Sequence, residues 1–187
     1  MAPSYNNHKS EEHKSHAASD NSAILYNSIR DAVLIVDKNR RITDCNPAFT
    51  QLFGYSLDEI HGKTTEFIYR DKSTYEKMGK KIKEIPDPDF IFTISYKKKN
   101  GNIFPGETSV FPLKNSDGKQ LGIVGMIRDI SKQLEAEELV KNEEKKYRTI
   151  FHESPIGILH YDIDGEIIDC NKKLTEILGT DKNKVIG

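Results

Sequence analysis

Runs of β-branched and apolar residues, separated by turn-forming residues, predict five β-strands in the first two thirds of the chain. The first run is apolar at nearly every position, which is typical of a strand buried on both faces. The third and fourth runs flank the pair Asn100 and Gly101, which favours a tight hairpin turn. The strands are expected at residues 32–37, 41–45, 90–98, 103–113 and 120–129.

Two of these strands contain residues that strands usually avoid. Pro105 and Gly106 interrupt the fourth run, so we expect a bulge or an edge position near its start. Gly106 and Gly125 lack side-chain bulk and could leave room for a bound molecule, although close packing by a neighbour explains such glycines equally well.

A short helix is expected directly after the second strand. Asn46 provides the side-chain acceptor preferred at a helix N-cap, and Pro47 occupies the first turn, where a missing N–H is harmless. Phe49 and Phe53 lie on one apolar stripe, and Gly54 can end the helix in the left-handed conformation.

Further helices follow from similar signals. Ser56 and Glu59 form the pattern of a capping box for a second short helix. Residues 64–70 are expected to be irregular, and residues 73–84 to form a helix that ends before Pro86 and Pro88. Residues 22–29 are expected to be a helical lead-in to the first strand.

Residues 131–151 differ in composition from the rest of the chain, because sparse apolar residues are spaced among many charged ones. This pattern predicts an amphipathic connecting helix. A two-stranded coiled coil is an open alternative, although Glu143 occupies a position where the seam would need an apolar residue.

The chain contains an internal repeat. The segment Ile42 to Gly54, ITDCNPAFTQLFG, returns as IIDCNKKLTEILG, shifted by 125 positions, and residues 27–62 share nine identities in 36 pairs with residues 152–187. The second copy has no counterpart of the last three strands, so it is interpreted as a truncated domain, too small to bury a secure core alone.

Composition and charge argue against nucleic-acid binding, membrane spanning and secretion. The formal net charge is −1, which gives no general attraction to nucleic acid, and no apolar run approaches the roughly 20 residues that span a bilayer. Residues 1–21 are polar, and this composition predicts a disordered tail. They also lack the apolar core of a secretory signal, so a cytoplasmic location is expected. Cys45 and Cys170 are equivalent in the repeat and are interpreted as small buried residues, not metal ligands.

The order of these elements, together with the run FGYSLDEIHG, the Lys-Asn-Gly hairpin and Arg128-Asp129-Ile130-Ser131, resembles a PAS sensory domain. The resemblance implies an α+β fold with a five-stranded antiparallel sheet flanked by short helices. It assigns residues 22–130 to a PAS domain, 131–151 to the connecting helix and 152–187 to a partial second PAS domain.

The resemblance also implies a cavity that can hold a small ligand, and a relay at the end of the last strand. The relay would be Arg128, Asp129 and Ile130, where Asp129 either couples the pocket to the helix or simply caps that helix through Ser131. The residues expected to face the cavity, or to serve as ordinary core, are Phe49, Phe53, Ile68, Tyr75, Met78, Ile94, Val110, Val124 and Met126.

Cofactor chemistry is constrained by two positions. Thr65 stands where flavin-binding light sensors of this family carry a reactive cysteine, so a cysteinyl-flavin adduct is excluded. The resemblance implies that a haem ligand would be a histidine of the helix at residues 73–84, which contains none, so haem binding is not expected. His61 lies at a helix C-terminus, where a surface role is favoured. The identity of any cofactor is otherwise open.

No catalytic or metal-binding pattern occurs in the sequence, so the chain is not expected to be an enzyme. The expected function is a cytoplasmic sensory module of a signalling protein, such as a sensor histidine kinase or a multi-PAS regulator. It would form a homodimer through PAS and helix contacts, bind a small molecule, and contact neither nucleic acid nor membrane. The alternative is a dimerisation module that binds no ligand.

Overall fold

The computed structural model describes residues 21–83 and 90–186, and it divides the chain into two compact units between residues 131 and 132. Residues 21–28 are helical, as expected of the lead-in segment. The expected tail, apart from residue 21, and the expected helix end at Pro86 and Pro88 lie outside the described residues.

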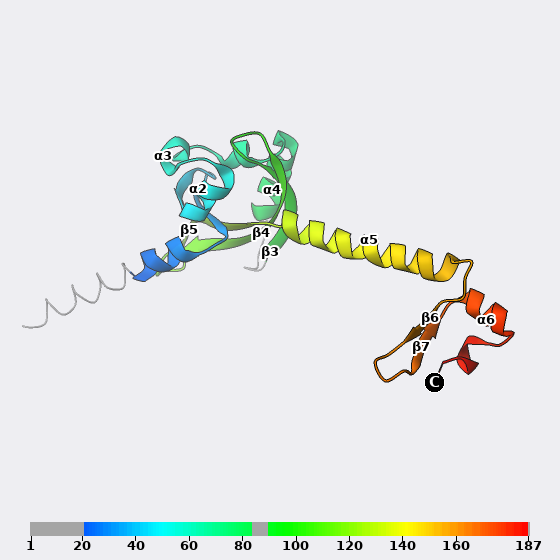
Figure 1. Cartoon of the computed structure of the whole chain (residues 1–187). Helices are drawn as coiled ribbons and strands as arrows, with labels where there is room; N and C mark the ends of the chain where they lie inside the picture. The colour runs from blue at the N-terminus through cyan, green and yellow to red at the C-terminus, as the bar shows by residue number, and fades with distance from the viewer. Residues whose placement is uncertain (1–20, 84–89, 187) are drawn as a thin grey trace, which may run out of the picture. The chain divides into compact units, whose positions relative to one another are not determined.

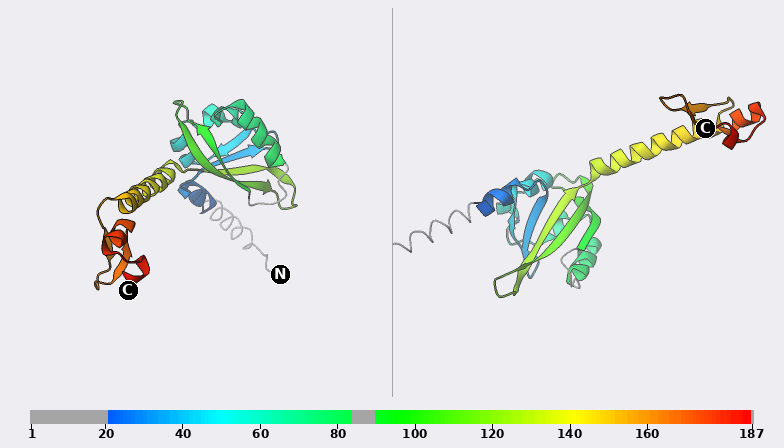
Figure 2. Two further views of the ribbon diagram at one scale, coloured as in Figure 1. Left: turned by 90° about the vertical axis from the view of Figure 1, so that its right-hand side faces the viewer. Right: turned by 90° about the horizontal axis from the view of Figure 1, so that it is seen from below.

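The first unit contains the expected five-stranded antiparallel sheet, which is seen from two sides in Figure 2. The strands are ordered β2-β1-β5-β4-β3, so β5 pairs with β1 on one side and with β4 on the other. Every strand lies within a residue or two of its expected bounds: β1 Ala32–Asp37, β2 Ile42–Cys45, β3 Phe90–Lys97, β4 Ile103–Lys114 and β5 Gln120–Asp129.

Within the described residues of the first unit, four short helices cover one face of this sheet (Figure 1). Three were expected, and the fourth is a 3-10 helix within the segment expected to be irregular. The capping box of Ser56 and Glu59 is present at the start of α3. The helices are α2 Pro47–Phe53, α3 Leu57–Ile60, the 3-10 helix η1 Thr65–Ile68 and α4 Lys72–Lys83.

Asn46 joins β1, the lead-in segment and α2 through one buried side chain. Its Oδ1 accepts the backbone N–H groups of Val33 at 2.8 Å and Phe49 at 2.9 Å. Its Nδ2 donates to the carbonyl oxygens of Ile29 at 3.3 Å and Asp31 at 3.0 Å. The N-cap expected from sequence is therefore also the point that fixes the helix to the sheet.

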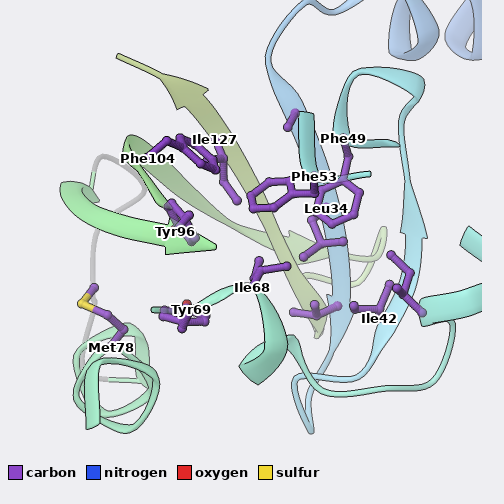
Figure 3. Packing of buried hydrophobic residues seen from close by; sticks show 13 residues of the cluster. Leu34, Ile42, Phe49, Phe53, Ile68, Tyr69, Met78, Tyr96, Phe104 and Ile127 are labelled. Atoms are coloured by element: carbon purple, nitrogen blue, oxygen red, sulfur yellow. The ribbon is translucent and has the colours of Figure 1, made fainter. Parts of the chain in front are cut away.

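The hydrophobic core lies between the sheet and these helices (Figure 3). Phe53 is at its centre and is completely buried. Its ring stacks on Phe49 with 4.6 Å between the ring centroids, and it meets Tyr96 and Phe104 edge-on at 5.8 and 5.5 Å.

Of the two alternatives expected at Pro105 and Gly106, a bulge or an edge position, the bulge is not present. Pairing between β3 and β4 runs without a shift from Phe90 opposite Val110 to Lys97 opposite Ile103. The alternative of a local edge fits better, because Pro105 lies beyond the end of β5 and its carbonyl accepts the N–H of Ile130 at 3.1 Å. Gly106 is required for packing: a Cβ there would lie 2.5 Å from Cδ2 of the Tyr96 ring.

The second unit begins in the connecting helix α5, Ser131–Glu153, and repeats the start of the first. Asn171 makes bonds equivalent to those of Asn46, since it accepts the N–H groups of Ile158 and Leu174 and donates to the carbonyl of Ile156. The other elements are β6 Leu159–Tyr161, β7 Ile167–Cys170, α6 Lys172–Leu178 and the 3-10 helix η2 Lys182–Lys184.

None of the helices in the described ranges combines the length and apolar character that a membrane crossing would require.

Candidate functional site

A cavity of about 60 Å³ opens between the inner face of the sheet, η1 and α4. Its lining is mostly apolar, with one charged side chain and four hydroxyl groups among the described residues. It is lined by Leu34, Val36, Arg40, Thr65, Ile68, Tyr69, Ile82, Phe92, Tyr96, Thr108, Val110, Ile123, Gly125 and Ile127.

The structure divides the residues expected at the cavity into three groups. Ile68 and Val110 line it. The others that face the same side of the sheet serve the core next to it, as the alternative interpretation allowed (Figure 3). Of these, Phe49, Phe53 and Met78 are buried in the core, and Tyr75 and Ile94 pack against it while partly exposed.

The prediction that Val124 and Met126 face the cavity was wrong, because the neighbouring residues of β5 face it instead. Successive residues of a strand point to opposite faces, and the cavity is lined by Ile123, Gly125 and Ile127. Val124 and Met126 therefore point to the other face of the sheet, where both are only partly buried.

Two hydroxyl groups meet inside the cavity, and this pair was not predicted from the sequence. The hydroxyl of Tyr96 lies 2.7 Å from Oγ1 of Thr108, and both residues are buried. Burial raises the pKa of the Tyr96 phenol above its usual range, so this group stays protonated. A pattern of single residues could not have found the pair, because its members lie on two strands.

The cavity is too small for a large aromatic cofactor as it stands. Benzene occupies an engineered cavity of about 150 Å³, whereas this one measures about 60 Å³. Thr65 does line it, so the position at which light sensors of the resembled family carry cysteine is at the site. His61 is exposed at the end of α3 and is not part of the lining.

The three residues expected to form a relay are each tied to a different segment at the end of β5. Arg128 pairs with Asp31 through two bonds of 3.1 and 2.8 Å. Ile130 donates to the carbonyl of Pro105. Asp129 accepts from the backbone N–H and the hydroxyl of Ser131, the first residue of α5, at 3.0 and 2.6 Å.

Asp129 stays ionised at this junction. Partial burial raises its pKa, but bonds from the hydroxyl and backbone N–H of Ser131 and from Lys98 at 3.3 Å outweigh that effect and lower it below the ordinary value. The capping contact to Ser131 that the sequence suggested is therefore present.

Comparisons with known proteins agree with this architecture. A family model described as a PAS domain matches residues 30–132, and a second PAS domain model matches residues 145–187. The crystal structure of a PAS domain from Colwellia psychrerythraea is similar, with a TM-score of 0.56 and 22% identity over 62% of this chain and 98% of that one.

Two curated sensor proteins are similar in sequence. "Sensor protein TdiS" of Thauera aromatica is 24% identical over 76% of this chain, and "Sporulation kinase C" of Bacillus subtilis is 27% identical over 73% of it. The chain spans about a third of the length of each, because the matches cover 33% of both relatives.

Proposed function

The chain belongs to the PAS domain family, and from this premise we propose that it is a ligand-binding sensory module of a larger signalling protein, such as a sensor histidine kinase. A small molecule would occupy the cavity, and the change would pass along β5 to α5. The observation that supports this most is the position of the cavity: it is lined by β5, the strand that ends at Asp129 and leads into the helix.

A ligand acts as a signal only if it binds one arrangement of the protein better than another. We expect the two arrangements to differ at the end of β5, because Arg128, Asp129 and Ile130 each bond to a separate segment there. A small displacement of β5 would change these bonds together. The module itself would perform no catalysis, and any kinase activity would belong to other parts of a longer protein.

A ligand-free dimerisation module is the second candidate, and exposed apolar residues support it. Ile24 and Leu25 on the lead-in helix are 61% and 69% exposed, and Ile91 on β3 is 59% exposed. Leu139 and Val140 on α5 are similarly exposed, at 63% and 68%. Burying these apolar side chains between two subunits would stabilise a dimer.

Native mass spectrometry of the purified chain separates the two candidates. The sensory proposal predicts that the protein carries a small molecule, which denaturation releases and a second spectrum identifies. A dimer that carries no small molecule, and that acquires none from a library of metabolites, would favour the dimerisation module and contradict the sensory proposal.

A further inference from the structure

Arg40 is unusual because its backbone is in a conformation that suits glycine. Its φ is 60°, in the left-handed region that side chains other than those of Asn and Asp rarely adopt. The equivalent residue of the second repeat, 125 positions later, is Gly165, with a φ of 87°. The first unit therefore carries a long charged side chain where the backbone alone would favour glycine.

The side chain of Arg40 is held at the cavity by specific contacts. Its guanidinium lies 3.8 Å from the centre of the Tyr75 ring and donates through Nη1 to the carbonyl of Tyr75 at 3.2 Å. Nη2 lies 3.5 Å from the hydroxyl of Tyr69, at the limit of a hydrogen bond. These contacts place the group, and for its remaining N–H donors the described residues offer no further hydrogen-bond partner.

Gly79 in α4 makes room for this guanidinium. A Cβ at position 79 would lie 2.2 Å from Nη1 of Arg40, so any other residue would displace it. Glycine inside a helix is less favourable than alanine. Gly79 therefore lowers the stability of α4 while it leaves space for the Arg40 side chain.

Within the part of the chain that the structure describes, the guanidinium of Arg40 forms no ion pair. Arg40 is half-buried, and among the described residues no carboxylate lies within ion-pair distance of it. Partial burial of an unpaired charge is unfavourable, and a carboxylate suits a guanidinium because two parallel N–H···O bonds can form.

The remainder of the cavity is suited to hydrocarbon. Its walls are apolar, and the hydroxyls of Tyr96 and Thr108 already bond to each other. One water-sized atom needs roughly 10–15 Å³ of such space, so the cavity admits about four to six non-hydrogen atoms.

We propose that this cavity is a site for a small aliphatic monocarboxylate, whose carboxylate pairs with Arg40 and whose hydrocarbon tail lies among the apolar walls. The proposal rests on the sensory function proposed above and specifies its ligand class. The competing explanation is that Arg40 serves only as a structural link between the turn after β1 and α4.

Calorimetric titration of the full 187-residue chain with sodium butyrate at neutral pH tests this proposal. We expect Arg40→Gln to bind butyrate at least about tenfold more weakly than the unmodified chain, because charge-assisted bonds are lost. Butyramide, which has the same shape without the charge, should bind the unmodified chain similarly weakly. Arg41→Gln is the matched control, since it removes the same charge from an exposed neighbour that bonds to Gly62.

Gly79→Ala provides an independent variant if Arg40→Gln fails to fold. Alanine favours the helix and displaces only the flexible end of Arg40, so this protein should fold while its affinity for butyrate falls. Equal binding of butyrate and butyramide, or binding unaffected by both variants, would overturn the carboxylate proposal but leave the sensory function intact. Failure of butyrate to bind would overturn it too, and the sensory function would fail with it only if mass spectrometry also detected no bound molecule.

Discussion

Replacing Asn46 by alanine should lower the free energy of unfolding of the first unit by about 2–4 kcal/mol. The substitution removes the N-cap of α2 and leaves the buried N–H of Val33 and the carbonyl of Asp31 without their side-chain partner. Loss of a cap costs about 1 kcal/mol, and each buried group left unsatisfied adds about 1–3 kcal/mol before any relaxation. Urea denaturation followed by circular dichroism measures the change.

Asn46→Asp is the informative control. The carboxylate retains an acceptor for the N–H groups of Val33 and Phe49 but cannot donate to the carbonyls of Ile29 and Asp31. If Asn46 joins both segments, this variant should also be destabilised at neutral pH. Wild-type stability in Asn46→Ala would show that the network does not hold α2 on the sheet.

Replacing Phe53 by alanine should destabilise the first unit by about 3–5 kcal/mol, the range for large aromatic residues in a core. Phe53 is fully buried, and its ring contacts three other aromatic rings. The same denaturation experiment applies. Gln51→Ala, on the exposed side of the same helix, should change stability by no more than about 0.5 kcal/mol. A loss below about 1 kcal/mol for Phe53→Ala would mean that the core is not packed as described.

Most helices and strands of the fold could be predicted from short local patterns in the sequence. Asn46, Pro47 and Gly54 mark the two ends of α2, and the structure shows the side-chain cap at one end and a left-handed residue at the other. Such signals depend on the chemistry of a few neighbouring residues, so they survive without knowledge of the rest of the molecule. The repeat added a second instance of the same cap at Asn171.

The face of β5 could not be predicted in this way. Its sequence GIVGMI is apolar or glycine at every position, so no alternation of polar and apolar residues shows which side chains face inward. Val124 and Met126 were assigned to the wrong face for this reason. The pairing with β1 and β4 decides it, and that pairing involves residues about 90 and 15 positions away.

The polar part of the candidate site was also missed, because its contacts join residues distant in sequence. Arg40 reaches Tyr75 and Gly79 in α4, and Tyr96 reaches Thr108 across two strands. The comparison of Arg40 with Gly165 was the one available signal. A repeat that keeps glycine in one copy and replaces it with a charged residue in the other indicates a role for that side chain.

Coupling between the cavity and the end of β5 is what the proposed sensory function requires most. Hydrogen–deuterium exchange of the amides of Ile130 and Ser131 measures it directly, because these amides bond to Pro105 and Asp129. The exchange rates of these amides would be compared in the unmodified chain without butyrate, in the same chain with butyrate, and in the variant Gly125→Val. At Gly125 a Cβ meets only the Leu34 carbonyl oxygen at 3.9 Å, so a side chain there can fill the space.

Filling the cavity by either means should change the exchange rate of these two amides together with that of the cavity-lining strands. Protection of the lining strands with unchanged exchange at Ile130 and Ser131 would contradict the account.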